Sequence, residues 1–142
     1  DDLPSHGSLP PGVSRADVAS KMLQVFRKHQ IAQVYGFING SNFQGSTWQV
    51  ANDWRAAGYP LGNHTWSHPN LSRTDLKEFL ANIDKNDELL SKPEYRPEQK
   101  WFRYPFLREG ETLEKRNGVR AHLATIEYKI AQVTIDFEDW AW

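Results

Sequence analysis

Apolar residues follow two patterns that alternate along the chain. Spacings of three and four residues, typical of amphipathic helices, occur in four stretches: residues 14–29, about 47–57, between Ser72 and Pro93, and about 112–125. Short apolar runs, typical of strands, lie between or after them: residues 33–38, 61–64, 101–104 and 130–135. Helices alternating with strands predict an α/β fold, in which helices cover a parallel sheet.

Local signals refine three of these elements. Ser14 followed by Asp17 is a capping box and predicts the start of the first helix. Its buried face is predicted to carry Val18, Met22, Val25 and Phe26. Gly118 is predicted to interrupt the last helix, and residues 130–135 are predicted to form a buried strand.

Polar residues follow the predicted strands. They are Asp1-Asp2 (after a strand that would precede them), His64 to His68, Arg103 to Pro105 and Asp136 to Asp139. The carboxyl ends of parallel strands carry the sites of α/β barrels and open α/β sheets. We therefore expect these groups to lie close together at the carboxyl end of the sheet or barrel.

Composition narrows the classes of function. A chain of 142 residues fits one domain, residues 1–142. The formal net charge of −1 gives no basic surface for nucleic acid, and no apolar run is long enough to span a bilayer. The chain has no cysteine, which excludes disulfides and thiolate metal sites.

His64 and His68 are the strongest chemical signal. Two imidazoles and one carboxylate form a typical catalytic zinc site with a position left open, and Asp1-Asp2 supplies carboxylates. Thr65 stands where a thermolysin-type motif has Glu, which excludes that class. The alternative interpretation is that the two histidines are ordinary polar turn residues.

Arg103 lies within an aromatic strand. A buried arginine needs a carboxylate partner, and Asp1, Asp136 and Asp139 are the candidates. The alternative is an exposed guanidinium whose stem lies on aromatic rings.

Four motifs together resemble the polysaccharide deacetylase family, the NodB homology domain of carbohydrate esterase family 4. Asp1-Asp2-Leu3-Pro4 resembles the end of Thr-Phe-Asp-Asp-Gly-Pro, and His64-Thr65-Trp66-Ser67-His68 matches His-Ser/Thr-x-x-His. Arg103-Tyr104-Pro105-Phe106 is similar to Arg-x-Pro-Tyr, and Asp136-Phe137-Glu138-Asp139-Trp140 matches Asp-x-x-Asp-Trp. The motifs come in the family's order and cover nearly the whole chain.

The resemblance implies a deformed (β/α) barrel and a divalent metal ion, expected to be zinc. It implies roles for these residues: metal ligands Asp2, His64 and His68; catalytic residues Asp1 (general base), Arg103 (orienting Asp1), Phe106 (backbone oxyanion donor) and Asp139 (orienting a general acid); substrate contacts Trp140, Tyr104 and Phe106.

The chain departs from the family pattern at both ends. Leu3 replaces the family's Gly, and the Thr-Phe half of the first motif and the last motif, Leu-x-His, have no counterpart. We therefore expect a barrel that is incomplete in this chain, as in a segment of a longer protein. The general acid has no assigned residue, and His6 and His122 stand as candidates.

The resemblance implies hydrolysis of acetyl groups, amide or ester, from an acetylated glycan, outside the cytoplasm. Two alternatives stay open: a glycan-binding domain without catalysis, and an amidohydrolase acting on substrates other than sugars. A non-haem iron oxygenase also uses two histidines and one carboxylate, but it leaves Arg103 and Asp139 without a role.

Overall fold

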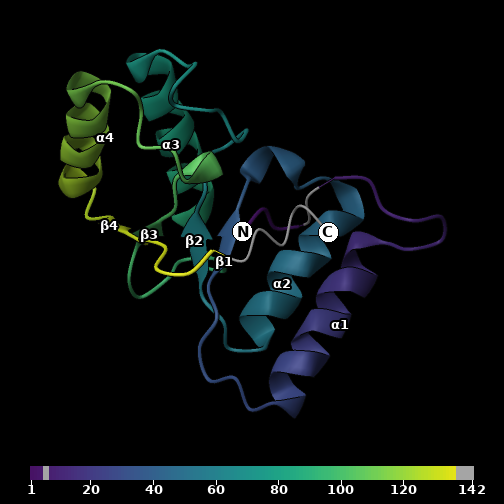
Figure 1. Ribbon diagram of the computed structural model, residues 1–142. Helices are drawn as coiled ribbons and strands as arrows, with labels where there is room; N and C mark the ends of the chain where they lie inside the picture. Colours follow the sequence, from purple (N-terminus) through teal and green to yellow (C-terminus); the bar gives the residue numbers. More distant parts are fainter. Residues whose placement is uncertain (5–6, 137–142) are drawn as a thin grey trace.

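The computed structural model describes residues 1–4 and 7–136. Helices and strands alternate through this part of the chain, as predicted (Figure 1). The helices are α1 (Arg15–Lys28), α2 (Trp48–Ala56), α3 (Leu76–Leu90) and α4 (Leu113–Thr125). The strands are β1 (Gly36–Ile38), β2 (Leu61–Asn63), β3 (Trp101–Phe102) and β4 (Lys129–Ile130), and the 3-10 turns are η1 (Gly40–Asn42), η2 (Gly45–Thr47) and η3 (Pro105–Leu107).

The strands form one parallel sheet in the order β1-β2-β3-β4. Leu3 adds a parallel bridge to Ile38, which places the start of the chain beside the end of β1. Crossovers between parallel strands are right-handed, so a sheet in sequential order collects its helices on one face, as in a (β/α) barrel. An incomplete α/β barrel is therefore confirmed.

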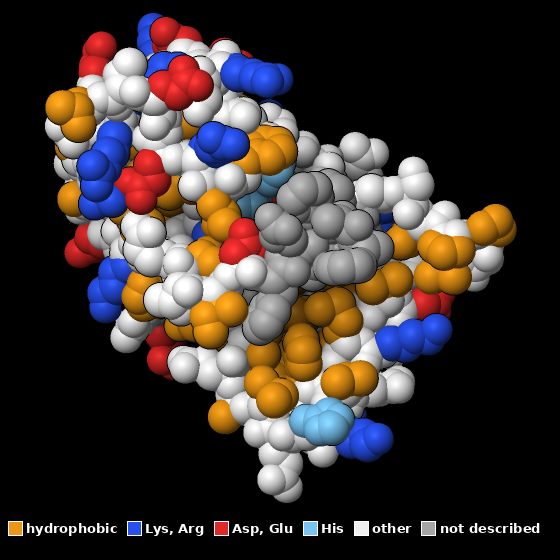
Figure 2. Space-filling view, viewed as in Figure 1, with side chains coloured by type: hydrophobic (Ala, Val, Ile, Leu, Met, Phe, Trp, Pro, Cys, Tyr) orange, Lys and Arg blue, Asp and Glu red, His pale blue; other side chains and the backbone are white. Residues whose placement is uncertain are grey.

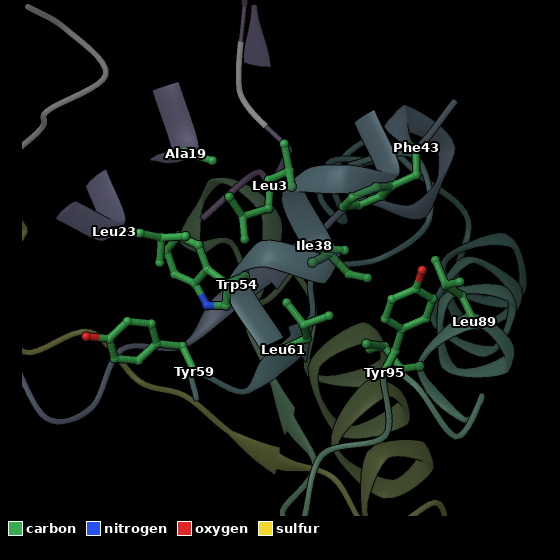
Figure 3. Packing of buried hydrophobic residues seen from close by; sticks show 13 residues of the cluster. Leu3, Ala19, Leu23, Ile38, Phe43, Trp54, Tyr59, Leu61, Leu89 and Tyr95 are labelled. Carbon is green, nitrogen blue, oxygen red and sulfur yellow. The ribbon is translucent and has the colours of Figure 1, made fainter. Parts of the chain in front are cut away.

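The helices pack on the sheet through two apolar clusters. The first lies where α1 and α2 cover β1 and β2, and its side chains point toward one another around Trp54, Ile38 and Leu61 (Figure 3). The second lies between α3, α4 and β3, around Phe79 and Phe102. Together they anchor the strands whose ends carry the polar motifs. No helix in the described ranges is both long and apolar enough to cross a bilayer. On the face shown in Figure 2, acidic and basic side chains are interspersed over α3 and α4.

The buried face of α1 differs in part from the predicted one. Ala19 and Leu23 are buried there, whereas Met22 and Val25 are 40% and 52% exposed. Phe26, which was predicted on the buried face, does pack against the same core and meets the Trp54 ring edge-on, so the buried stripe runs through Ala19, Leu23 and Phe26. Apolar periodicity alone does not distinguish two overlapping stripes.

The prediction of an interruption at Gly118 and the prediction of a buried strand at 130–135 were wrong. Helix α4 runs unbroken through Gly118, where a Cβ would lie 2.6 Å from Leu76, so glycine permits close packing on α3. Strand β4 ends at Ile130, and Ile135 is 68% exposed. Within the described residues β4 is the edge of the sheet, so the apolar residues after it have no partner strand to cover them.

Gly62 leaves room for the Phe37 ring beside β2. A Cβ at residue 62 would lie 2.6 Å from the Phe37 ring and 3.1 Å from the Trp101 carbonyl oxygen. We expect Gly62→Ala to lower the free energy of unfolding by about 1–3 kcal/mol through overpacking, measured by urea denaturation. In a Phe37→Leu background the same change should cost less, and an equal cost in both backgrounds would contradict this explanation.

Candidate metal centre

Asp2, His64 and His68 meet at the carboxyl end of the sheet. Asp2 lies beside β1 through the Leu3 bridge, and the histidines lie in the loop that follows β2. The Asp2 Oδ1 atom is 3.5 Å from His64 Nε2 and 3.2 Å from His68 Nε2. The candidate ligand atoms of all three residues lie within 4.8 Å of one another. The structure thus brings together the three residues for which the sequence predicts metal binding.

The hydrogen bond at the other nitrogen of His64 assigns its tautomer. His64 Nδ1 lies 2.8 Å from the backbone oxygen of Arg103. Because a carbonyl oxygen only accepts, Nδ1 carries the hydrogen and, in the neutral ring, Nε2 presents a lone pair. That lone pair faces the Asp2 carboxylate, so two acceptors point at each other across 3.5 Å.

Burial keeps His64 neutral. The side chain is 2% exposed, and burial lowers its pKa to about 4, although the bond to Arg103 O and the charge of Asp2 act in the opposite direction. A proton between His64 and Asp2 is therefore disfavoured at neutral pH. A divalent cation would satisfy both acceptors, and an imidazole anchored through its second nitrogen is the usual metal-ligating arrangement. The donor set fits such an ion.

Asp1 pairs with Arg103 next to these ligands. Arg103 Nη1 lies 3.3 Å from Asp1 Oδ2, and the guanidinium lies over the Phe37 ring at 4.8 Å. Burial lowers the pKa of Arg103 from its ordinary value, but a guanidinium remains charged at neutral pH. Of the carboxylates predicted as partners for Arg103, the structure shows Asp1.

The segment after Arg103 places two further predicted residues. The Phe106 ring is 56% exposed and its centroid lies 4.5 Å from that of His68. Tyr104 is buried and packs edge-on against Phe102 at 4.9 Å, and burial raises its pKa to about 12. Tyr104 also borders a pocket of about 280 Å³ shared with Arg103. Contact between Tyr104 and a substrate stays a prediction. Because the Tyr104 side chain is buried, a substrate would have to reach it through this pocket.

Of the remaining predicted residues, His122 and Asp136 lie in the described part of the chain. Asp139, Trp140 and His6 fall outside the described residues. His122 Nε2 lies 2.6 Å from Asp84 Oδ1, which ties α4 to α3 and uses none of the three candidate ligands. Asp136 is exposed at the rim of the pocket that Arg103 borders.

Sequence reasoning missed three asparagines that support the histidine loop. Asn39, Asn63 and Asn86 are fully buried and hydrogen-bonded around it. One signal was available: Asn86 falls on the apolar stripe of α3, between Ile83 and Leu90. A polar residue at a core position needs buried partners, and here those partners are the ends of β1 and β2.

The pKa of His64 makes the stability of the metal-free protein depend on pH. In the unfolded chain its pKa is 6.5, and in the folded chain about 4. The contribution of neutral His64 is thus complete above pH 6.5, and it is lost as the pH falls toward 4, by roughly 3 kcal/mol. Urea denaturation in chelator across this window should show the loss. His64→Gln should lack this component, and an identical pH dependence in both proteins would contradict the assignment.

Comparisons with known proteins identify the family to which the chain belongs. Residues 1–123 match the family model described as polysaccharide deacetylase. The chain is 31% identical over 124 residues to a peptidoglycan-N-acetylglucosamine deacetylase of Bacillus cereus, a match that covers 84% of this chain and 40% of that protein. The chain thus spans less than half the length of this curated relative.

Two solved structures illustrate the range of its structural neighbours. Peptidoglycan deacetylase PdaC from Bacillus subtilis superposes with a TM-score of 0.68 at 27% identity, covering 92% of this chain and 58% of that one. A carbohydrate esterase family 4 pseudoenzyme from Bacillus anthracis superposes with a TM-score of 0.72 at 18% identity, covering 89% and 42%, and shows the shared fold alone. From the family match over most of its length, we conclude that this chain belongs to the polysaccharide deacetylase family.

Proposed function

We propose that this protein hydrolyses acetyl groups from an acetylated glycan and depends on a divalent metal ion held by Asp2, His64 and His68. The observation that carries the proposal is the convergence of these three side chains, whose candidate ligand atoms lie within 4.8 Å of one another, with the Nε2 atoms of both histidines next to the Asp2 carboxylate. Zinc is the ion expected for two imidazoles and one carboxylate with an open position.

The residues around this centre have the chemistry that the reaction needs. A bound divalent ion would act as a Lewis acid toward water and toward the acetyl carbonyl. Asp1 would accept the proton of the attacking water, and Arg103 would hold the Asp1 carboxylate in place. The Phe106 N–H would donate to the developing oxyanion, a type of contact whose removal typically costs about 100- to 1,000-fold in rate.

The activities of two relatives support a substrate class. The Bacillus cereus relative is a peptidoglycan-N-acetylglucosamine deacetylase, and PdaC is a peptidoglycan deacetylase. We therefore propose an N-acetylated glycan of the peptidoglycan or chitin type as the substrate and, by the same likeness, action outside the cytoplasm.

Acetate release tests this function. Purified protein loaded with Zn²⁺ should release acetate from N-acetylglucosamine oligomers, lose that activity with a chelator, and recover it when Zn²⁺ is added back. Retention of full activity in chelator, with no metal bound, would contradict metal dependence.

The same assay separates the alternatives. A pseudoenzyme with this fold makes a non-catalytic glycan-binding domain a specific second candidate. Binding of the oligomer without acetate release would favour that candidate. Acetate release from small acetylated amides, but from none of the acetylated oligosaccharides, would favour an amidohydrolase acting on substrates other than sugars.

A further inference from the structure

Three buried asparagines lie next to the histidine loop; two of them bond to each other and the third bonds to the loop backbone. Asn39 follows β1, Asn63 ends β2, and Asn86 lies in the C-terminal half of α3. Their exposed fractions are 1%, 0% and 0%. We call them the asparagine cluster. None of the three belongs to the proposed metal ligands or to the Asp1–Arg103 pair.

Asn86 ties the two strand ends to α3. Its Nδ2 donates to Ile38 O and to Asn63 Oδ1, both at 3.0 Å, and its Oδ1 accepts from Gly40 N at 3.0 Å. Both ends of this amide are therefore engaged inside the protein. Because a buried amide without partners is costly, these bonds give the cluster one preferred arrangement.

Asn63 and Asn39 form hydrogen bonds with the backbone around Thr65. Asn63 Oδ1 accepts from Thr65 N at 2.8 Å. Asn39 Nδ2 donates to His64 O at 2.7 Å and to Thr65 O at 3.2 Å. Thr65 Oγ1 in turn accepts from His68 N at 3.2 Å. Both peptide groups that flank Thr65 are thus held by the asparagine cluster.

Thr65 needs this support because its backbone is strained. Its φ is 68°, in the left-handed region that a β-branched residue rarely adopts. This turn lies between the two histidines, whose ring centroids are 4.9 Å apart with both Nε2 atoms near Asp2. If Thr65 relaxed to an ordinary conformation, the chain between His64 and His68 would change direction and the two imidazoles would separate.

We propose that Asn39 and Asn63 are positioning residues for the metal. They hold Thr65 in its left-handed conformation, so that His64 and His68 face one cation before it binds. Asn86 fixes both strand ends and so supports the arrangement. The inference rests on the proposed function, because it assumes the metal centre, and it adds residues that do not touch the ion.

The test measures metal affinity in the purified protein. The Zn²⁺ dissociation constant is determined by competition with a chromophoric chelator for wild type, Asn39→Ala and Asn63→Ala. We expect both variants to bind Zn²⁺ about 10- to 100-fold more weakly, the loss usual for residues that orient ligands. The visible absorption of the Co²⁺-loaded protein should change as well, because the ligand geometry changes.

Asn39→Ala keeps the test valid if Asn63→Ala does not fold. Asn39 Oδ1 has no hydrogen-bond partner within the described part of the chain, so the alanine removes only the two bonds to the loop. Ile83→Val is the matched control, because it loosens the same buried region of α3 without a side-chain bond to the loop. It should lower the thermal midpoint and leave the Zn²⁺ affinity and the Co²⁺ spectrum unchanged.

The outcomes separate this inference from the proposed function. If wild type binds Zn²⁺ and folded Asn39→Ala binds it equally well with the same Co²⁺ spectrum, positioning by the cluster is overturned and the metal centre stands. An equal loss of affinity in Ile83→Val would also overturn it, since general loosening would then explain the effect. If wild type binds no Zn²⁺, the proposed function is overturned together with this inference.

Discussion

Asp1→Asn is expected to lower the turnover of acetylated oligosaccharide by about 100- to 10,000-fold, the usual contribution of a general base. An asparagine has nearly the shape of aspartate and keeps an oxygen that can accept a hydrogen bond from Arg103 Nη1. In the wild-type protein this nitrogen lies 3.3 Å from Asp1 Oδ2. It cannot take a proton from the attacking water. Zinc content, measured by elemental analysis, should therefore stay at one equivalent while acetate release falls.

Asp84→Asn is the matched control for this experiment. It makes the same change in charge at an exposed carboxylate on α3 that pairs with His122. Its turnover should remain near that of wild type. Wild-type turnover in Asp1→Asn would remove Asp1 from the mechanism, and loss of zinc in that variant would make Asp1 a ligand rather than a base.

The arrangement of the site could be predicted because it depends on the order of the strands more than on individual side-chain contacts. Asp2, His64 and Arg103 each come at or near the end of a strand or strand-like segment, and a parallel sheet brings such ends to one edge. The helix that starts at Ser14 was equally accessible, since its capping box with Asp17 is a local signal that the structure confirms.

Features that depend on contacts between distant segments could not be predicted in the same way. The tautomer of His64 is set by the backbone oxygen of Arg103, which is 39 positions away in the chain. The strained backbone of Thr65 is held by Asn39, which directly follows the predicted strand 33–38, and by Asn63, which lies within the predicted strand 61–64. Periodicity reports which residues are apolar, but it does not report where a buried amide finds its partner.

His68→Ala and His64→Ala are expected to abolish stoichiometric zinc binding. Each variant removes one of three candidate ligand side chains, whose ligand atoms lie within 4.8 Å of one another. Residues that only orient a ligand cost about 10- to 100-fold in affinity when they are removed, so loss of a ligand should weaken binding by more than about 100-fold. Competition with a chelator and elemental analysis of the dialysed protein measure this directly.

His122→Ala is the matched control for the loss of zinc binding in His64→Ala and His68→Ala. It also removes an imidazole close to a carboxylate, with His122 Nε2 2.6 Å from Asp84 Oδ1, but between α3 and α4 rather than at the strand ends. Because one histidine and one carboxylate make a weaker chelating set than two histidines and a carboxylate, this variant should keep one equivalent of zinc. Zinc lost from His122→Ala but retained by His64→Ala and His68→Ala would move the metal centre away from the loop after β2, and Asp2 would then have no cation to share with the histidines.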